Sequence, residues 1–102
     1  MFKRFDAKDR LETRVLTFDF TLDLAPTELL IDPPIVSIEV QTGYDTEPES
    51  IIAGEGALDI GGLLFRLPVH GGNPDTEYAI KVWFATTNPN KSSALTGILP
   101  VF

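Results

Sequence analysis

The sequence holds few of the side chains that enzymes use as nucleophiles or general bases. It has no cysteine and one histidine, His70, which precedes two glycines at the end of an expected strand. A serine nucleophile needs a base within hydrogen-bond reach, and none of the four serines lies in a Gly-x-Ser-x-Gly turn. A single imidazole also supplies too few ligands for zinc. We therefore expect no catalytic residue, metal or cofactor, and we interpret His70 as a residue at the rim of the fold.

Carboxylate pairs could act as acid and base, and the chain has fifteen Asp and Glu residues. Asp19 and Asp23 would share one face of an expected strand. Four residues of strand separate them by about 13 Å, which exceeds the roughly 5–9.5 Å of glycosidase pairs. This pair is expected to line a solvated face or to meet basic groups of a partner.

Two loop segments have compositions that invite a ligand. The acidic segment Asp45–Glu49 offers oxygens to a cation, but it lacks the spacing of a known calcium loop. It is interpreted as an acidic turn, and cation binding stays open. The glycine-rich segment 54–62 contains Glu55 and Asp59, which would repel phosphate, and a strand follows it where a phosphate cradle needs a helix. It is predicted to be a flexible loop.

The segment PDTEYAIKV, residues 74–82, places a tyrosine at the start of an alternating strand. It is similar to the Pro-x-Thr-x-Tyr corner of fibronectin type III and immunoglobulin-like domains, where the tyrosine hydroxyl bonds to backbone a few residues upstream. The resemblance implies a structural role for Tyr78, with Asp75 as a turn residue. It predicts a fold and says nothing of function.

The elements that would position these residues are strands, because apolar residues recur at every second position. Alternating runs occupy residues 16–24, 36–40, 63–69, 78–84 and 95–101. Turn-forming residues lie between them, among them Asp32-Pro33-Pro34 and the glycines at 71 and 72. No window has the periodicity of a helix. The expected fold is all-β, an immunoglobulin/fibronectin type III-like antiparallel β-sandwich of about seven strands.

Length and charge limit the organisation and the partners. The 102 residues fit one domain, and no segment approaches the roughly 20 apolar residues of a membrane span. The net charge is −7, yet residues 1–14 hold five basic against three acidic residues. We predict a basic N-terminal arm (1–12) before a single β-sandwich domain (13–102). The acidic body is expected to bind neither nucleic acid nor membrane.

Strand parity and the arm supply the candidate interface. With Tyr78 facing inward, Trp83 faces outward beside Lys81, and exposed aromatic residues are enriched at binding hot spots. The alternative is that the arm or another segment covers this face. The arm itself would dock on its own body or on a neighbour, or would be a solvated, mobile terminus. The candidate interface residues are Trp83, Lys81, Ile98, Phe2, Lys3, Arg4 and Phe5.

The order of features along the chain resembles a family of virion proteins. A charged opening (Asp9-Arg10-Leu11-Glu12) precedes the strand DFTLDLA (19–25), a tyrosine-led hairpin follows, and the chain closes on Leu99-Pro100-Val101. In this order and in its length the chain is similar to the small immunoglobulin-like proteins of tailed bacteriophages that are described as fibre–tail adaptors.

This resemblance implies a non-enzymatic structural subunit located in the virion, at the tail, collar or fibre attachment. Its partners would be other virion proteins and its own copies in a symmetric ring. One alternative is a capsid decoration protein. Another is an accessory carbohydrate-binding β-sandwich, which needs several coplanar exposed aromatic residues and finds only one Trp and two Tyr here.

Overall fold

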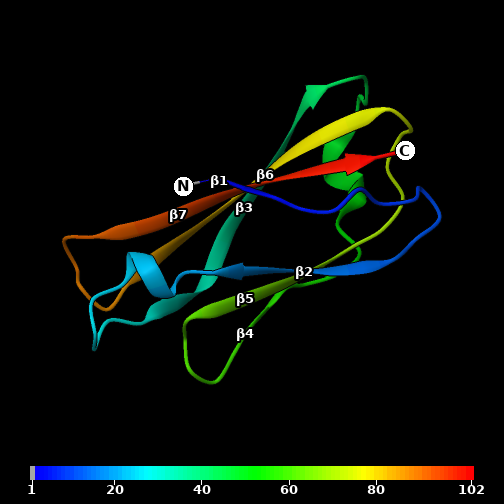
Figure 1. Ribbon diagram of the computed structural model, residues 1–102. Coiled ribbons are helices and arrows are strands. Elements are labelled where there is room, and N and C mark those ends of the chain that lie inside the picture. Colours follow the sequence, from blue (N-terminus) through cyan, green and yellow to red (C-terminus); the bar gives the residue numbers. More distant parts are fainter. Residues whose placement is uncertain (1) are drawn as a thin grey trace.

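The computed structural model describes residues 2–102, which form two β-sheets and two short 3₁₀ helices (Figure 1). In chain order the elements are β1 (Phe2–Arg4), β2 (Arg14–Asp19), η1 (Thr21–Asp23), β3 (Leu30–Thr42), η2 (Pro48–Ile51), β4 (Ala57–Leu58), β5 (Leu64–Val69), β6 (Thr76–Thr86) and β7 (Ser92–Val101). The four-stranded sheet has the order β1-β7-β6-β3, and the three-stranded sheet has the order β2-β5-β4. The prediction of an all-β protein is confirmed.

The core lies between the two sheets and is built from the alternating residues. On β6 the inward side chains are Tyr78, Ile80, Val82 and Phe84, each with an exposed fraction of 0%. The ring of Phe84 meets the rings of Phe20 and Phe65 edge-on, with centroids 5.4 Å and 5.3 Å apart. Each fully buried side chain of this size contributes about 1.5–3 kcal/mol. The period-two pattern therefore specifies which face of each strand is buried.

β2 ends at Asp19, earlier than the alternation through Leu24 predicts. The Asp19 carboxylate accepts hydrogen bonds from the backbone N–H and the hydroxyl of Thr21, at 2.9 Å and 2.6 Å. These bonds turn the chain into η1, because a side chain that binds nearby backbone competes with the sheet. Leu22 is consequently 87% exposed. The prediction that Asp19 and Asp23 share a strand face is wrong.

The turn predicted at Asp32-Pro33-Pro34 lies inside β3. The pairing of β3 with β6 shifts register between Ile31 and Ile35, so these residues form an irregularity in a continuous strand. Proline has no backbone N–H to donate, and it is tolerated here because β3 is an edge strand. The interruption leaves this edge of the sandwich open.

The N-terminal segment, predicted to be an arm, contributes an edge strand to the body. β1 pairs in parallel with β7, with Lys3 opposite Gly97 and Arg4 opposite Ile98. This pair is an exception to the antiparallel arrangement that was predicted. The backbone N–H of Lys8 donates to the Pro100 carbonyl at 2.9 Å, so the segment follows β7 beyond the strand itself.

The glycine-rich segment 54–62 contains the short strand β4, whereas a flexible loop was predicted throughout. Ala57 and Leu58 pair with Arg66 and Phe65 of β5. A Cβ atom at Gly56 would collide with the Phe65 ring, so close packing requires a glycine there. The segment forms the free edge of the three-stranded sheet.

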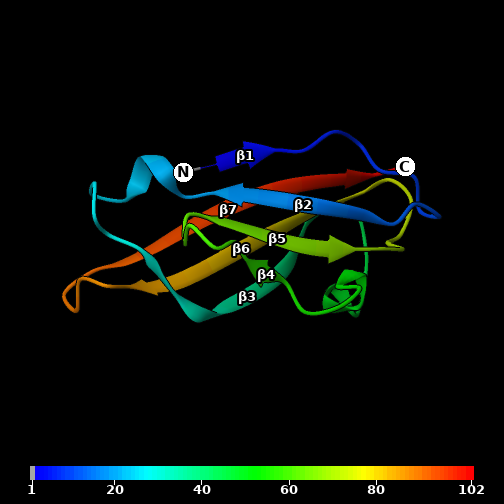
Figure 2. The same ribbon diagram turned by 90° about the horizontal axis from the view of Figure 1, so that it is seen from below.

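The molecule is elongated, with extents of 41 × 22 × 20 Å. The loops 20–29, 59–63 and 87–91 gather at one end, which we call the β2–β3 end. Hydrogen bonds join them there: the Leu30 N–H donates to the Gly62 carbonyl, and the Leu29 N–H donates to the Thr87 hydroxyl. Figure 2 shows β1 and β2 along one side of the sandwich and β3 and β4 along the other.

Candidate protein-interaction site

Tyr78 is fully buried near the start of β6. Its hydroxyl accepts a hydrogen bond from the Asn73 backbone N–H at 2.8 Å and donates one to the Asp45 carboxylate at 2.6 Å. Burial, helped by the hydrogen bond to Asp45, raises the pKa of Tyr78 to about 12. Asp75 lies in the preceding turn with a positive φ of 57°. Tyr78 thereby ties β6 to two loops at the end opposite the β2–β3 end.

The residues considered for catalysis or cation binding do not form one cluster. The Asp45 carboxylate, part of the acidic segment Asp45–Glu49, is occupied by Tyr78 and by the Glu47 backbone N–H. Nε2 of the exposed His70 lies 3.2 Å from the carbonyl oxygen of Ser50. Within residues 2–102 no three His, Cys, Asp or Glu side chains are placed to hold a metal ion together. The helices of this part of the chain are all too short to cross a bilayer.

Phe5, predicted as an interface residue, belongs to the core. Its side chain is 9% exposed, and its ring meets the Phe18 ring edge-on at a centroid distance of 5.4 Å. Gly97 makes room for it, because a Cβ atom there would collide with the Phe5 ring. The Lys3 ammonium lies 5.0 Å from the centroid of the same ring. The side chain of Phe2, also predicted at the interface, lies outside the described residues.

Ile98, expected to extend an exposed patch, lies on the outer face but is only 5% exposed. Arg4 is opposite Ile98 on the neighbouring strand, and its guanidinium forms an ion pair with Glu77 on β6. To reach Glu77 the Arg4 side chain has to pass over β7 near Ile98. The prediction of an accessible Ile98 is therefore wrong, because β1 and the Arg4 side chain cover Ile98.

Trp83 and Lys81 lie on the outer face of the four-stranded sheet, as parity predicts. Trp83 is half-buried and lies opposite Ile35, which is 63% exposed. With Ser37, these side chains line a shallow hollow of about 280 Å³. Trp83 therefore forms part of a shallow mixed surface and does not protrude as an anchor.

Lys8 is a buried cation that the sequence did not reveal. Its exposed fraction is 0%, and its ammonium donates to the carbonyl oxygens of Asp9 and Gly71 at 2.8 Å and 2.7 Å. Burial lowers the pKa of Lys8, although the negative charge of Glu12 acts in the opposite direction. The bond to Gly71 fastens the N-terminal segment to the loop after β5.

A second buried charge stabilises the β2–β3 end. The Glu28 side chain accepts a hydrogen bond from the Lys91 ammonium at 2.6 Å, and this contact lowers the pKa of Glu28. Lys91 also donates to the Asp23 carbonyl at 2.6 Å. One ammonium therefore holds the loop 20–29 against the loop 87–91.

The β2–β3 end exposes four aliphatic side chains, which we call the aliphatic end patch. They are Leu22 (87% exposed), Leu29 (43%), Ile31 (45%) and Ile60 (108%). Leu29 lies next to Gly62, and Gly62 belongs to the same loop (59–63) as Ile60. The sequence pattern does not reveal this patch, because the alternation assigns Leu22 to the core and because Ile60 lies in a glycine-rich segment that was predicted to be a flexible loop. Four exposed aliphatic side chains at one end of the molecule make this end the candidate interaction surface.

Two carboxylates beside the patch are held in the charged form. Asp19 accepts two hydrogen bonds from Thr21, and these lower its pKa. Asp59 accepts hydrogen bonds from the backbone N–H groups of Leu64 and Leu63, each at 3.1 Å, which lower the pKa of Asp59. Lys3 acts on the charge of Asp19 and Arg66 on that of Asp59, so charges of both signs lie around these two carboxylates.

The comparisons with known proteins return no relative. No family model matches the chain, and neither a curated protein nor a solved structure does.

Proposed function

We propose that this chain is a non-enzymatic structural subunit of a tailed-phage particle, an adaptor that docks against other virion proteins at the tail, collar or fibre attachment. The observation that carries the docking role is the aliphatic end patch. Leu22 and Ile60 project from two loops with almost their whole side chains in solvent. Covering each of them would contribute about 1.5–3 kcal/mol to binding before the costs of association. The assignment to a phage particle depends on the sequence resemblance.

The loops that present the patch are held in place, which favours docking. Lys91 joins Glu28 and the Asp23 carbonyl, and the Leu29 N–H is bonded to Thr87. A surface that is ordered before binding loses less conformational entropy when a partner arrives. The patch is therefore suited to a partner that meets a preformed shape.

The immunoglobulin/fibronectin type III-like fold is part of the proposal. The orders β3-β6-β7 and β2-β5-β4 correspond to the C-F-G and B-E-D strands of such sandwiches. The bond between the Tyr78 hydroxyl and the Asn73 N–H agrees with a tyrosine corner. In antibody variable domains, loops at one end of a sandwich of this type carry the binding residues.

Charge indicates what the patch would meet. The chain carries a net charge of −7. Two copies that met through their patches would therefore repel each other. The partner at this end is proposed to be another virion protein, and a symmetric ring of copies would use the sides of the sandwich.

Quantitative mass spectrometry of purified particles from the source phage or prophage tests the proposal. Copies of this chain are counted against the major capsid protein. A few to a few tens of copies per particle would support an adaptor at the tail or collar. Hundreds of copies would instead make the chain a capsid decoration protein, and absence from the particle would contradict both functions.

Particle incorporation of variants tests the patch. Leu22→Ser/Ile60→Ser should enter particles much less efficiently than the wild type, because it removes the apolar contact. Leu11→Ser/Val15→Thr is the matched control, since Leu11 and Val15 are 87% and 56% exposed and lie away from the β2–β3 end. Equal incorporation of both variants would show that the aliphatic end patch is not the docking surface.

A further inference from the structure

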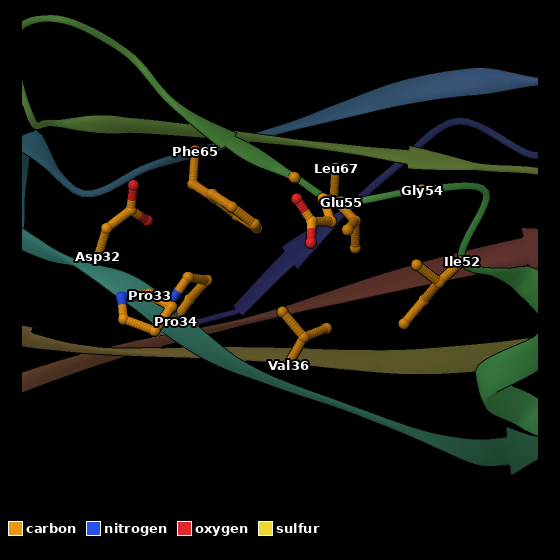
Figure 3. A pocket seen from close by; sticks show the side chains of 10 residues that line it. Asp32, Pro33, Pro34, Val36, Ile52, Gly54, Glu55, Phe65 and Leu67 are labelled. Carbon is orange, nitrogen blue, oxygen red and sulfur yellow. The ribbon is translucent and has the colours of Figure 1, made fainter.

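A cleft of about 470 Å³ opens between the edge strands β3 and β4, on the side of the sandwich away from β1 (Figure 3). Its apolar lining consists of Pro33, Pro34, Val36, Ile52, Phe65 and Leu67. Figure 3 shows two carboxylates at this cleft, Asp32 from β3 and Glu55 from the loop before β4. The volume lies in the range of sites that take small molecules or single large side chains.

The sequence keeps this edge of the sandwich open. The prolines shift the register of β3 between Ile31 and Ile35, and β4 is only two residues long. Gly54 and Gly56 line the cleft without side chains, and the Gly56 backbone lies against the Phe65 ring. No backbone pairing joins β3 to β4, and the interior residues Phe65 and Leu67, which are 1% and 2% exposed, form the floor of the opening.

Both carboxylates at the cleft lack a partner within residues 2–102. Neither Asp32 nor Glu55 forms an ion pair with a basic side chain there, and none of the residues that line the cleft is basic. A carboxylate beside apolar surface favours a cation, and the apolar lining favours an alkyl chain or a flat ring-like group. The cleft therefore offers both the negative charge and the apolar surface that would bind an alkyl cation.

We propose that this cleft binds an arginine side chain of a partner protein. A guanidinium is flat and carries five N–H donors, so it can bond to two separate carboxylates while one face lies on a proline ring. An ammonium is compact and strongly hydrated, and it would use the flat lining less well. The inference rests on the proposed function in one respect, which is that a docking protein supplies the arginine. The adaptor would then have two separate docking surfaces, the aliphatic end patch and this cleft.

Titration of the isotope-labelled full chain by NMR tests the cleft directly. The probe is the blocked peptide acetyl-Gly-Arg-Gly-amide, compared with the same peptide carrying citrulline, which keeps the shape of arginine without its charge, and with a lysine version. The arginine peptide should shift the backbone amides of the cleft, such as those of Val36, Ile52 and Phe65. Its dissociation constant should be lower than that of the citrulline peptide by about tenfold or more, with the lysine peptide between them.

A matched pair of variants separates the cleft from general attraction to an acidic protein. Asp32→Asn/Glu55→Gln should abolish the advantage of arginine over citrulline. Glu47→Gln/Glu49→Gln changes the net charge by the same amount at exposed carboxylates outside the cleft lining, and it should keep that advantage. Equal binding of the arginine and citrulline peptides, or an equal loss in both variants, would overturn the proposal. Shifts spread over the acidic residues of the whole surface would do the same.

The particle experiment distinguishes the failure of this inference from the failure of the proposed function. If the arginine peptide does not bind the cleft but the chain is found in particles, only the inference is wrong. If the peptide binds but the chain is absent from particles, the cleft site stands and the phage assignment is wrong. In particles, Asp32→Asn/Glu55→Gln should lower the copy number relative to Glu47→Gln/Glu49→Gln.

Discussion

The N-terminal edge, formed by residues 2–8 along β7, buries Phe5 and Lys8, whereas the β2–β3 end leaves aliphatic side chains exposed. At the edge, Phe5 is 9% exposed and Lys8 is 0% exposed, because β7 and the loop after β5 supply their partners. At the end, Leu22 and Ile60 remain 87% and 108% exposed. Phe5, which was predicted to be available at an interface, is packed internally, and Leu22, which the alternation assigned to the core, is exposed.

The difference does not arise from looser structure at the β2–β3 end. The Glu28–Lys91 ion pair and the bond from Lys91 to the Asp23 carbonyl connect two of its loops. The end is therefore connected internally, as the N-terminal edge is through Lys8, but its aliphatic side chains point away from these connections. The aliphatic side chains at this end are therefore exposed in the ordered, folded protein, as a docking surface requires.

The largest expected effect lies at the N-terminal edge. Phe5→Ala should lower the free energy of unfolding by about 3 kcal/mol, because it empties the space beside Phe18 and Gly97. Urea denaturation measures this change. Leu11→Ala is the control at an 87% exposed position and should stay within about 0.5 kcal/mol. Equal urea midpoints for the two variants would mean that Phe5 is not packed into the core at the N-terminal edge.

The next largest effect on stability is expected at Tyr78, a buried polar side chain. Its pKa is raised from 10.0 to about 12, so the stability it provides is fully present below pH 10.0 and is lost as the pH rises to about 12. The wild type should lose on the order of 2 kcal/mol over this interval through Tyr78. Tyr78→Phe should lack this alkaline loss and should be less stable at neutral pH by about 1–3 kcal/mol, since Asn73 N–H and Asp45 lose their partner.

Absorbance of tyrosinate during an alkaline titration supplies the control for Tyr78. In Tyr44→Phe the remaining tyrosine should titrate near pH 12. A Tyr78 that titrates near the ordinary tyrosine value of 10.0 would contradict its buried position.

The all-β fold could be predicted because period-two alternation is a local signal. On β6 the four inward side chains from Tyr78 to Phe84 are all fully buried, as the pattern requires. The same signal misplaced Leu22, because Asp19 bonds to Thr21 and ends the strand while the alternation continues in the sequence. A hydrogen bond between two neighbouring polar residues was decisive there, and hydrophobic periodicity does not register it.

The candidate site was predicted less well because it depends on contacts between distant residues. The burial of Lys8 requires the carbonyl oxygen of Gly71, and the covering of Ile98 requires Arg4 to reach Glu77. Parity placed Ile98 on the correct face, but parity says nothing about a segment that lies over that face. The sequence showed a basic N-terminus, and only the structure showed where its cations are bound.

Glu28 gives a smaller, pH-dependent test at the β2–β3 end. The ion pair with Lys91 lowers the pKa of Glu28, so the stability it provides is present above the ordinary value of 4.5 and is lost as the pH falls through the lower, folded value. Glu28→Gln should therefore be less stable than the wild type at neutral pH, and the difference should shrink in acid. Urea denaturation at neutral and at acid pH measures this difference, and a difference that does not shrink in acid would contradict the ion pair.

The smallest effect on stability is expected at the aliphatic end patch. Leu22→Ser/Ile60→Ser should change the free energy of unfolding by no more than about 0.5 kcal/mol per position, because both side chains are solvated in the free protein. Urea denaturation of the purified chain measures this, beside Phe5→Ala as the destabilised reference. A loss as large as that of Phe5→Ala would mean that the patch supports the fold, and reduced particle incorporation would then follow from misfolding. Unchanged stability makes any loss of incorporation a loss of contact, since the free energy that these side chains do not contribute to folding is still available for binding a partner.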